Sequence, residues 1–379
     1  MDPSYSLSLV KPTKNFNKYD NAFSTPKIQP VIDYVNNTNS LIDYKLLNNI
    51  TELLPILRNT DELQKQLNQF SRIHSNKFKT YDAIKMANLD ALTNISEHLH
   101  GLLVPKTYDY NIDIEQKYET VVGNVSFESL ETRNPIPRYC ILYGAPGGFV
   151  EYLEWRIPKI YGYGITNRNN DWNLKLIRDV DPNTLSGFER IYGDSGSGNI
   201  RDHGLDFIVT LQEKSPNGLD FIIANGDFAG YDLYMEITIA ILTVKARGNI
   251  LIKLNDTWSK TITDLIYIIS LIFEKIEIIK PVISNPATSE RYLCCQSRRD
   301  NIDDLTELLN LFIDTEHEIF GLFEELPKNF TIWLTKINNT LAKYQLQFLQ
   351  NIIKAGNNET VVLEKIDLSR SLIIWGIPE

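Results

Sequence analysis

The segment "YCILYGAPGGFVEYLEWRIPKIYGYGI" at residues 139–165 constrains the fold more than any other part of the chain. An apolar run leads into a glycine turn, a helix-like stretch follows, and a second apolar run ends the segment. This order predicts a parallel β–α–β unit. Glycines in its first turn allow positive φ and let a ligand approach the backbone closely. We therefore expect a ligand there, although a tight turn without a ligand stays open.

The turn is built from small or rigid residues, which are Gly144, Ala145, Pro146, Gly147 and Gly148, with Phe149 next. It lacks the G-x-G-x-x-G spacing of a dinucleotide site and the Gly-Lys-Ser/Thr of a phosphate loop. Proline also has no amide hydrogen to offer a phosphate. A ligand without a pyrophosphate fits better, and S-adenosylmethionine is such a ligand.

Strand-like and helix-like segments alternate between residues 79 and 300, which predicts an α/β fold with a mostly parallel sheet covered on both faces. We expect strands at 139–143, 160–165, 188–192, 219–224, 249–254, 276–280 and 291–296. Helices are expected at 148–156, 230–246 and 261–273. Segment 205–212 could be either, because β-branched residues favour a strand and its position after a glycine-rich turn suits a helix.

Helical patterns flank this region on both sides. We predict an N-terminal arm and helical extension at residues 1–78, the α/β domain at 79–300 and a helical C-terminal extension at 301–379. Helices are expected at 41–59, 60–73, 301–326 and 329–356, and "SLIIWGIP" at 371–378 is expected to form a last strand.

Composition excludes some classes of function. The net charge of -10 excludes a general polyanion binder but not a local basic cleft. Cys140, Cys294 and Cys295 show no disulfide or zinc pattern, so we expect an intracellular, reducing compartment and no metal. The N-terminus lacks an apolar signal core, and the longest apolar run, at 263–280, is too short and broken to span a bilayer, so no membrane attachment is expected.

Four polar residues stand out against apolar surroundings: Lys85 in a helical stripe, Asn225 after a strand, Lys253 inside a strand and Glu290 before the last strand. Each alone has an ordinary explanation, such as an edge lysine or a loop charge. In open α/β sheets, ligands lie beyond the carboxyl ends of the strands. Asn225 and Lys253 are both expected at such ends, which favours one shared site.

The chain resembles the FtsJ-like family of ribose 2'-O-methyltransferases, and within it the mRNA cap enzymes of eukaryotes and large DNA viruses. The resemblance lies in "KMANLDA", "APGGFVEYLEWR", "IYGDSGSGNI", "NGDF", "LIKL" and "NPATSERY". It implies a Rossmann-like methyltransferase fold with a seven-stranded sheet, S-adenosylmethionine as cofactor and methyl transfer to the ribose 2'-OH of the first transcribed nucleotides of capped mRNA. A viral relative would act in the host cytoplasm or virion, a cellular one in the nucleus. The helical extensions are candidates for binding a protein partner.

The resemblance also implies a Lys-Asp-Lys-Glu tetrad, in which Lys85, Lys253 and Glu290 match and Asn225 replaces the aspartate. Asparagine keeps a hydrogen-bond acceptor but loses the charge, and Asp227 could restore it. Two alternatives follow: an active methyltransferase, or a weak or inactive subunit that binds RNA or a protein partner.

The implied cofactor contacts are the turn residues 144–149, Asp194, Asn199 and Asn225, with Asn199 at a position where the family usually has aspartate. For RNA, basic side chains are candidates, although any single one is more often a solvated surface charge: Arg156, Lys159, Arg168, Arg201, Arg291, Arg298 and Arg299. The last two are expected to form a modest basic cluster with Lys280.

Overall fold

The computed structural model describes residues 41–60, 63, 75, 77–103, 136–173, 175–181, 186–302, 322–323, 325–357, 368–375 and 377. The expected helix at 60–73 and most of the one at 301–326 lie outside these residues. Among the helices of the described ranges, none is long and apolar enough to cross a membrane.

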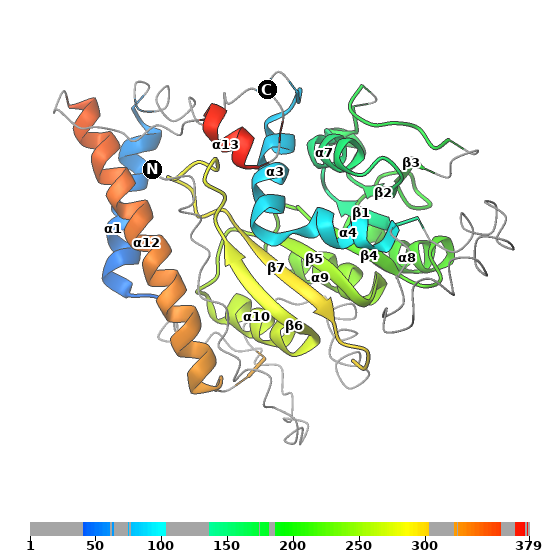
Figure 1. Cartoon of the computed structure of the whole chain (residues 1–379). Helices are drawn as coiled ribbons and strands as arrows, with labels where there is room; N and C mark the ends of the chain where they lie inside the picture. Colours follow the sequence, from blue (N-terminus) through cyan, green and yellow to red (C-terminus); the bar gives the residue numbers. More distant parts are fainter. Residues whose placement is uncertain are drawn as a thin grey trace, which may run out of the picture.

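A seven-stranded sheet with the order β3-β2-β1-β4-β5-β7-β6 forms the centre of the molecule (Figure 1). Its strands are β1 (Arg138–Leu142), β2 (Tyr161–Ile165), β3 (Gly187–Ile191), β4 (Leu219–Ala224), β5 (Val244–Leu254), β6 (Phe273–Ile279) and β7 (Arg291–Arg298). Strands β1 to β5 pair in parallel, and β7 runs antiparallel to both β5 and β6. The predicted α/β fold with a mostly parallel sheet is confirmed.

Helices cover both faces of the sheet, because its strands are apolar on both sides. Along β1, Cys140 and Leu142 face one core, whereas Tyr139 and Ile141 face the other. The first core is closed by α8 (Ile200–Lys214), α9 (Tyr231–Thr243) and α10 (Lys260–Ile272). The second is closed by α3 (Tyr81–Thr93), α4 (Ile95–Leu103) and α7 (Gly148–Arg156).

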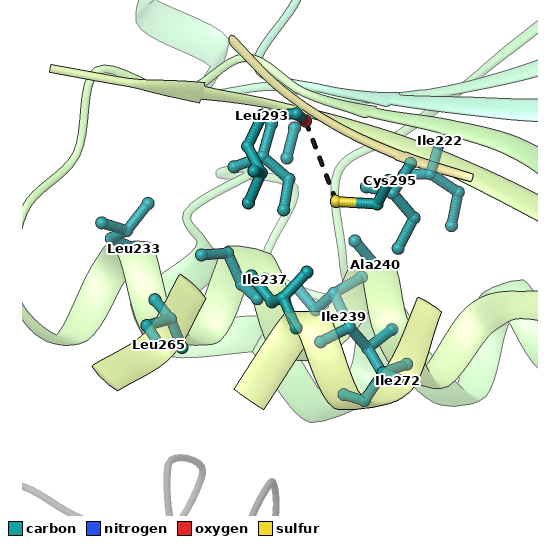
Figure 2. Close-up of a cluster of buried hydrophobic side chains, with 14 of the residues drawn as sticks. Ile222, Leu233, Ile237, Ile239, Ala240, Leu265, Ile272, Leu293 and Cys295 are labelled. Atoms are coloured by element: carbon teal, nitrogen blue, oxygen red, sulfur yellow. Dashed lines mark hydrogen bonds between the residues drawn. The ribbon is translucent and has the colours of Figure 1, made fainter. Parts of the chain in front are cut away.

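The first core is mainly aliphatic, with isoleucine and leucine as its commonest residues. Figure 2 shows sheet residues packing over α9 and α10, among them Ile222, Leu293 and Cys295 from the sheet and Leu233, Ile237, Ala240, Leu265 and Ile272 from the helices. Protein interiors are closely packed, so this layer holds the sheet above it rigidly.

Two helices outside this sandwich pack side by side, namely α1 (Tyr44–Arg58) and the long α12 (Lys328–Gly356), seen in blue and orange in Figure 1. They share a small third core that also includes Ala287, from the loop between β6 and β7. Other residues of α12 join the first core, and residues of α13 (Leu368–Ile374) join the second. The domain boundaries at residues 78 and 300 stay predictions.

The seven strands predicted between residues 139 and 296 all occur, one open alternative is resolved, and two expectations differ from the structure. The ambiguous segment 205–212 lies inside helix α8. The helix expected at 230–246 ends at Thr243, because β5 begins at Val244 and continues through polar residues that hide the strand pattern. The expected last strand at 371–378 was wrong: its first residues belong to α13, where Leu372 is buried, and the buried Trp375 follows directly after the helix.

Candidate functional site

The strand order places a ligand crevice between β1 and β4. From β1 the chain moves outward to β2 and β3, whereas from β4 it moves to β5 on the other side. Ligands of open α/β sheets bind beyond the carboxyl ends of the strands at such a switch point. The N–H of Asn225, just after β4, donates to the carbonyl of Leu142 at the end of β1 at 3.0 Å. The glycine turn and Asn225 therefore meet at the same edge, as the sequence predicted.

The glycines of the turn are required by close packing. A Cβ on Gly144 would collide with Ile141, and one on Gly148 would lie 2.5 Å from Oγ1 of Thr80. Gly147 has a φ of 117°, in the left-handed region that favours glycine. Its N–H donates to the carbonyl of Gly144 at 3.0 Å, so the turn is held in one conformation before α7 begins.

Carboxylates follow three of the parallel strands at this edge: Asp171 after β2, Asp194 after β3 and Asp227 after β4. A hydrogen bond from Tyr192 lowers the pKa of Asp171, and one from Asn255 lowers the pKa of Asp227. Ionised carboxylates suit the hydroxyl groups and positive charges of S-adenosylmethionine and repel a phosphate. These hydrogen-bond acceptors therefore fit the cofactor that the resemblance implies.

Asn199 caps a helix in this structure. Its Oδ1 accepts the N–H of Arg201 at 3.1 Å, and its Nδ2 donates to Asp202 at 2.8 Å. Asparagine is among the best residues at this position, because its side chain satisfies a free N–H of the first turn. A nearby contact between Ser195 and His203, whose ring also bonds Asp206 at 3.1 Å, braces the loop that carries Asp194.

Lys85 and Glu290 form an ion pair between distant parts of the chain. Lys85 on α3 is 7% exposed, and its Nζ lies 3.0 Å from Oε1 of Glu290 and 3.6 Å from Asp82. Helix α3 is fixed by its N-cap Thr80, which accepts the N–H of Ala83 at 3.2 Å. Because Glu290 precedes the reversed strand β7, it lies at the same edge as the ends of the parallel strands.

Lys253 lies near the end of β5, where its register partner on β7 is Tyr292. Its Nζ is 3.4 Å from Oδ1 of Asp227. Asn255 also donates to Asp227, and this bond, followed by the charge of Lys253, lowers the pKa of the aspartate. Asp227 is therefore the carboxylate that faces Lys253.

Asn225 acts as a bridge between three strand ends. Its Nδ2 donates to the carbonyl of Tyr143 at 3.4 Å, and its Oδ1 accepts the hydroxyl of Tyr292 at 3.2 Å. The carbonyl oxygen of Tyr143 can only accept a hydrogen bond, so the atom of residue 225 that faces it must be a donor. Asparagine meets both requirements, whereas an ionised aspartate would set an oxygen against the Tyr143 carbonyl.

Sequence reasoning missed one buried acid under this loop. Glu236 on α9 is fully buried, and its Oε1 accepts the N–H of Gly226 at 2.8 Å. Burial raises its pKa to about 8, although the Gly226 bond and Lys253 oppose the shift. A lone glutamate inside "YMEITIAIL" was the available signal.

Two of the basic RNA candidates were wrong, because they are interior residues. Arg291 is 2% exposed, donates to Thr257 at 2.8 Å and lies over the ring of Trp258 at 5.0 Å. Lys280 is buried and donates to three backbone carbonyls. Burial, followed by the charge of Arg291, lowers the pKa of Lys280 to about 7.

Four other candidates lie at the opposite edge of the sheet: Arg156 at the end of α7, Lys159 before β2, and Arg298 and Arg299 at the end of the reversed strand β7. Arg168 and Arg201 remain at the carboxyl edge. The first stacks on Tyr192 at 4.1 Å, and the second pairs with Asp232 at 2.9 Å. Among the described residues, no group of three or more metal-binding side chains occurs.

Comparisons with known proteins agree with this geometry. Residues 139–298 match the family model for FtsJ-like methyltransferase. Cap-specific mRNA (nucleoside-2'-O-)-methyltransferase 1 of Drosophila melanogaster is 25% identical over 83% of this chain and 41% of its own length. The Mus musculus protein of the same name is 31% identical over 43% of this chain and 22% of its own length. The chain thus spans less than half of these relatives.

Solved structures give weaker matches. Human methyltransferase-like protein 13 in complex with SAH is 12% identical, with a TM-score of 0.28 over 76% of this chain and 96% of that chain. The fold assignment rests instead on the strand order and the reversed seventh strand. This strand order agrees with the match of residues 139–298 to the family model for FtsJ-like methyltransferase.

Proposed function

We propose that this chain binds S-adenosylmethionine in the crevice between β1 and β4 and methylates the ribose 2'-OH of the first transcribed nucleotides of capped mRNA. The observation that carries the proposal is the meeting of Lys85, Glu290 and Lys253 at one sheet edge. The names of the relatives supply the substrate class, since they are cap-specific mRNA 2'-O-methyltransferases.

The turn at residues 144–149 and the aspartates after β2, β3 and β4 would hold the cofactor. When bound, S-adenosylmethionine supplies a methyl group on a positively charged sulfur. Backbone at the turn lies where strand β1 ends, at the carboxyl edge of the sheet where ligands of open α/β sheets bind. Asp194, after β3, would contact the cofactor, and Asp227 would balance positive charge beside Lys253.

Methyl transfer to a hydroxyl is an in-line displacement: the oxygen bonds the methyl carbon, the carbon–sulfur bond breaks, and the hydroxyl proton must leave. Alignment of the two reacting atoms is the larger part of the catalytic task. Lys253, on a rigid central strand, is suited to hold the hydroxyl, and in its neutral amine form it can receive the hydroxyl proton and become the ammonium ion that Asp227 faces. Glu290 fixes the position of Lys85, whose ammonium can stabilise developing negative charge on the oxygen.

Asn225 favours a second candidate function, in which the chain binds RNA or a partner without catalysis. Its side chain is committed to Tyr143 and Tyr292 and carries no charge. We favour the enzyme, because Asp227 lies against Lys253 at 3.4 Å and places a carboxylate beside it.

Methyl transfer from labelled S-adenosylmethionine to short capped and uncapped RNAs tests the proposal. Wild-type protein should label capped RNA selectively. Lys253→Met should lower the rate by ~10²-fold or more, since general-base assistance is worth at least that much. Lys343→Met, at an exposed position of α12, is the matched control and should keep full activity. Binding of cofactor and capped RNA without any labelling would favour the non-catalytic function.

A further inference from the structure

The loop between β6 and β7 positions Glu290, and its backbone is held by the side chain of its first residue, Lys280, and by side chains of α12. Nζ of Lys280 donates to the carbonyls of Asn285, Thr288 and Glu290 at 3.3, 2.8 and 3.1 Å. One buried ammonium thus uses its three donors on one loop. Residues 285–290 of this loop, called the arm below, are therefore held in one position.

Helix α12 holds the same loop from the other side. Gln345 is 4% exposed, and its Nε2 donates to the carbonyl of Ala287 at 2.7 Å. Its Oε1 accepts the hydroxyl of Ser289, the residue before Glu290, at 3.5 Å. The side chain of Ala287 packs into the core shared by α1 and α12. The arm is thus docked on α12 by both apolar and polar contacts.

A second buried amide on α12, two helical turns earlier, holds the loop after β5. Nδ2 of Asn338 donates to the carbonyl of Thr257 at 2.7 Å, and its Oδ1 accepts the Thr257 hydroxyl at 2.6 Å. Thr257 in turn accepts a hydrogen bond from Arg291, the first residue of β7, at 2.8 Å. Helix α12 therefore contacts the loops next to Lys253 and next to Glu290.

The buried amide side chains of Asn338 and Gln345 lie on a face of α12 that is otherwise apolar. Leu341 and Leu349 lie on that face, and a further leucine would pack there without the cost of burying polar atoms. Fully bonded polar networks specify one geometry, which apolar contacts do not. The amides of α12 therefore serve to fix position.

We propose that Gln345 is a positioning residue for the methyltransferase site, which acts through the arm at residues 285–290 to set Glu290 against Lys85. The inference rests on the proposed function for its catalytic part. It extends the site to α12, which lies beyond the residues that match the family model.

The test compares Gln345→Leu with Gln350→Leu, a control at an exposed position of the same helix. Hydrogen exchange of the peptide backbone should rise at residues 285–292 in Gln345→Leu and stay unchanged at 144–156. The rate constant kcat should fall about tenfold, with the Kd of S-adenosylmethionine unchanged. In a Glu290→Gln background the same substitution should cost little further rate, because the residue through which it acts is already altered.

The exchange and rate measurements each have an outcome that would contradict the proposed role of Gln345. Unchanged exchange at 285–292 would overturn it, whether or not the wild-type protein is active. A full tenfold loss in the Glu290→Gln background would show that Gln345 does not act through Glu290. If wild-type protein transfers no methyl group, the proposed function fails, and the exchange measurement alone decides whether α12 positions the arm.

Discussion

Replacing Glu236 by glutamine should make the protein less sensitive to pH. Glu236 is fully buried beneath Gly226, and burial raises its pKa from 4.5 to about 8. Between these values the folded protein keeps a proton that the unfolded chain has lost. Folding stability must therefore fall as pH rises from 4.5 towards 8, and glutamine removes this dependence while keeping an oxygen for the Gly226 N–H.

The size of the effect follows from the same shift. One pKa unit corresponds to about 1.36 kcal/mol, so from about pH 5 to about pH 7 the wild-type protein should lose ~2.5 kcal/mol relative to Glu236→Gln. In a chain of this size that corresponds to roughly 3 to 6 °C in Tm. The difference should shrink towards zero below about pH 4.5, where glutamic acid is neutral in both states.

Thermal unfolding of both proteins across this pH range measures the effect. Glu213→Gln, at an exposed position of α8, is the control and should follow the wild-type curve. Parallel curves for wild type and Glu236→Gln would refute the reasoning, because they would mean that Glu236 is charged in the folded protein.

Three further predictions concern the crevice. Gly144→Ala should lower stability by about 1–3 kcal/mol in denaturant unfolding, since its Cβ would collide with Ile141; an unchanged midpoint would contradict the packing account. Asn225→Asp should lower Tm most clearly above about pH 5, where the new carboxylate is ionised beside the Tyr143 carbonyl, and a higher Tm there would show that the site prefers a charge. S-adenosylmethionine in hundredfold excess over its Kd should stabilise the wild-type fold by about 2.7 kcal/mol, and no shift in Tm at millimolar ligand would count against cofactor binding.

The local parts of the fold could be predicted from the sequence, because a strand, a turn and a helix leave their pattern in neighbouring residues. The segment at 139–165 shows this, since β1, α7 and β2 lie where the pattern placed them. A short apolar run can form either a strand or a helix. Residues 371–374 are helical in α13, where Leu372 packs into the second core beside Trp375.

The sequence predicted which residues belong to the site, but it did not predict which of them contact each other. Lys85 and Glu290 meet only because β7 reverses direction, and the same reversal carries Arg298 to the far edge. The burial of Arg291 depends on Thr257 and Trp258, which no local pattern connects to it. Long-range pairing of this kind is decided by the whole fold.

The reversed strand β7 also fixes when the site can be completed during synthesis. It lies between β5 and β6, yet it leaves the ribosome after both. Until β7 inserts, β5 has an unpaired edge on that side. Lys85 is synthesised much earlier and cannot form its ion pair until Glu290 is in place. The helix α12, which docks the arm before β7, emerges later still. A chain released before α12 could therefore hold most of its sheet and its glycine turn while its lysine and glutamate were not yet set against each other.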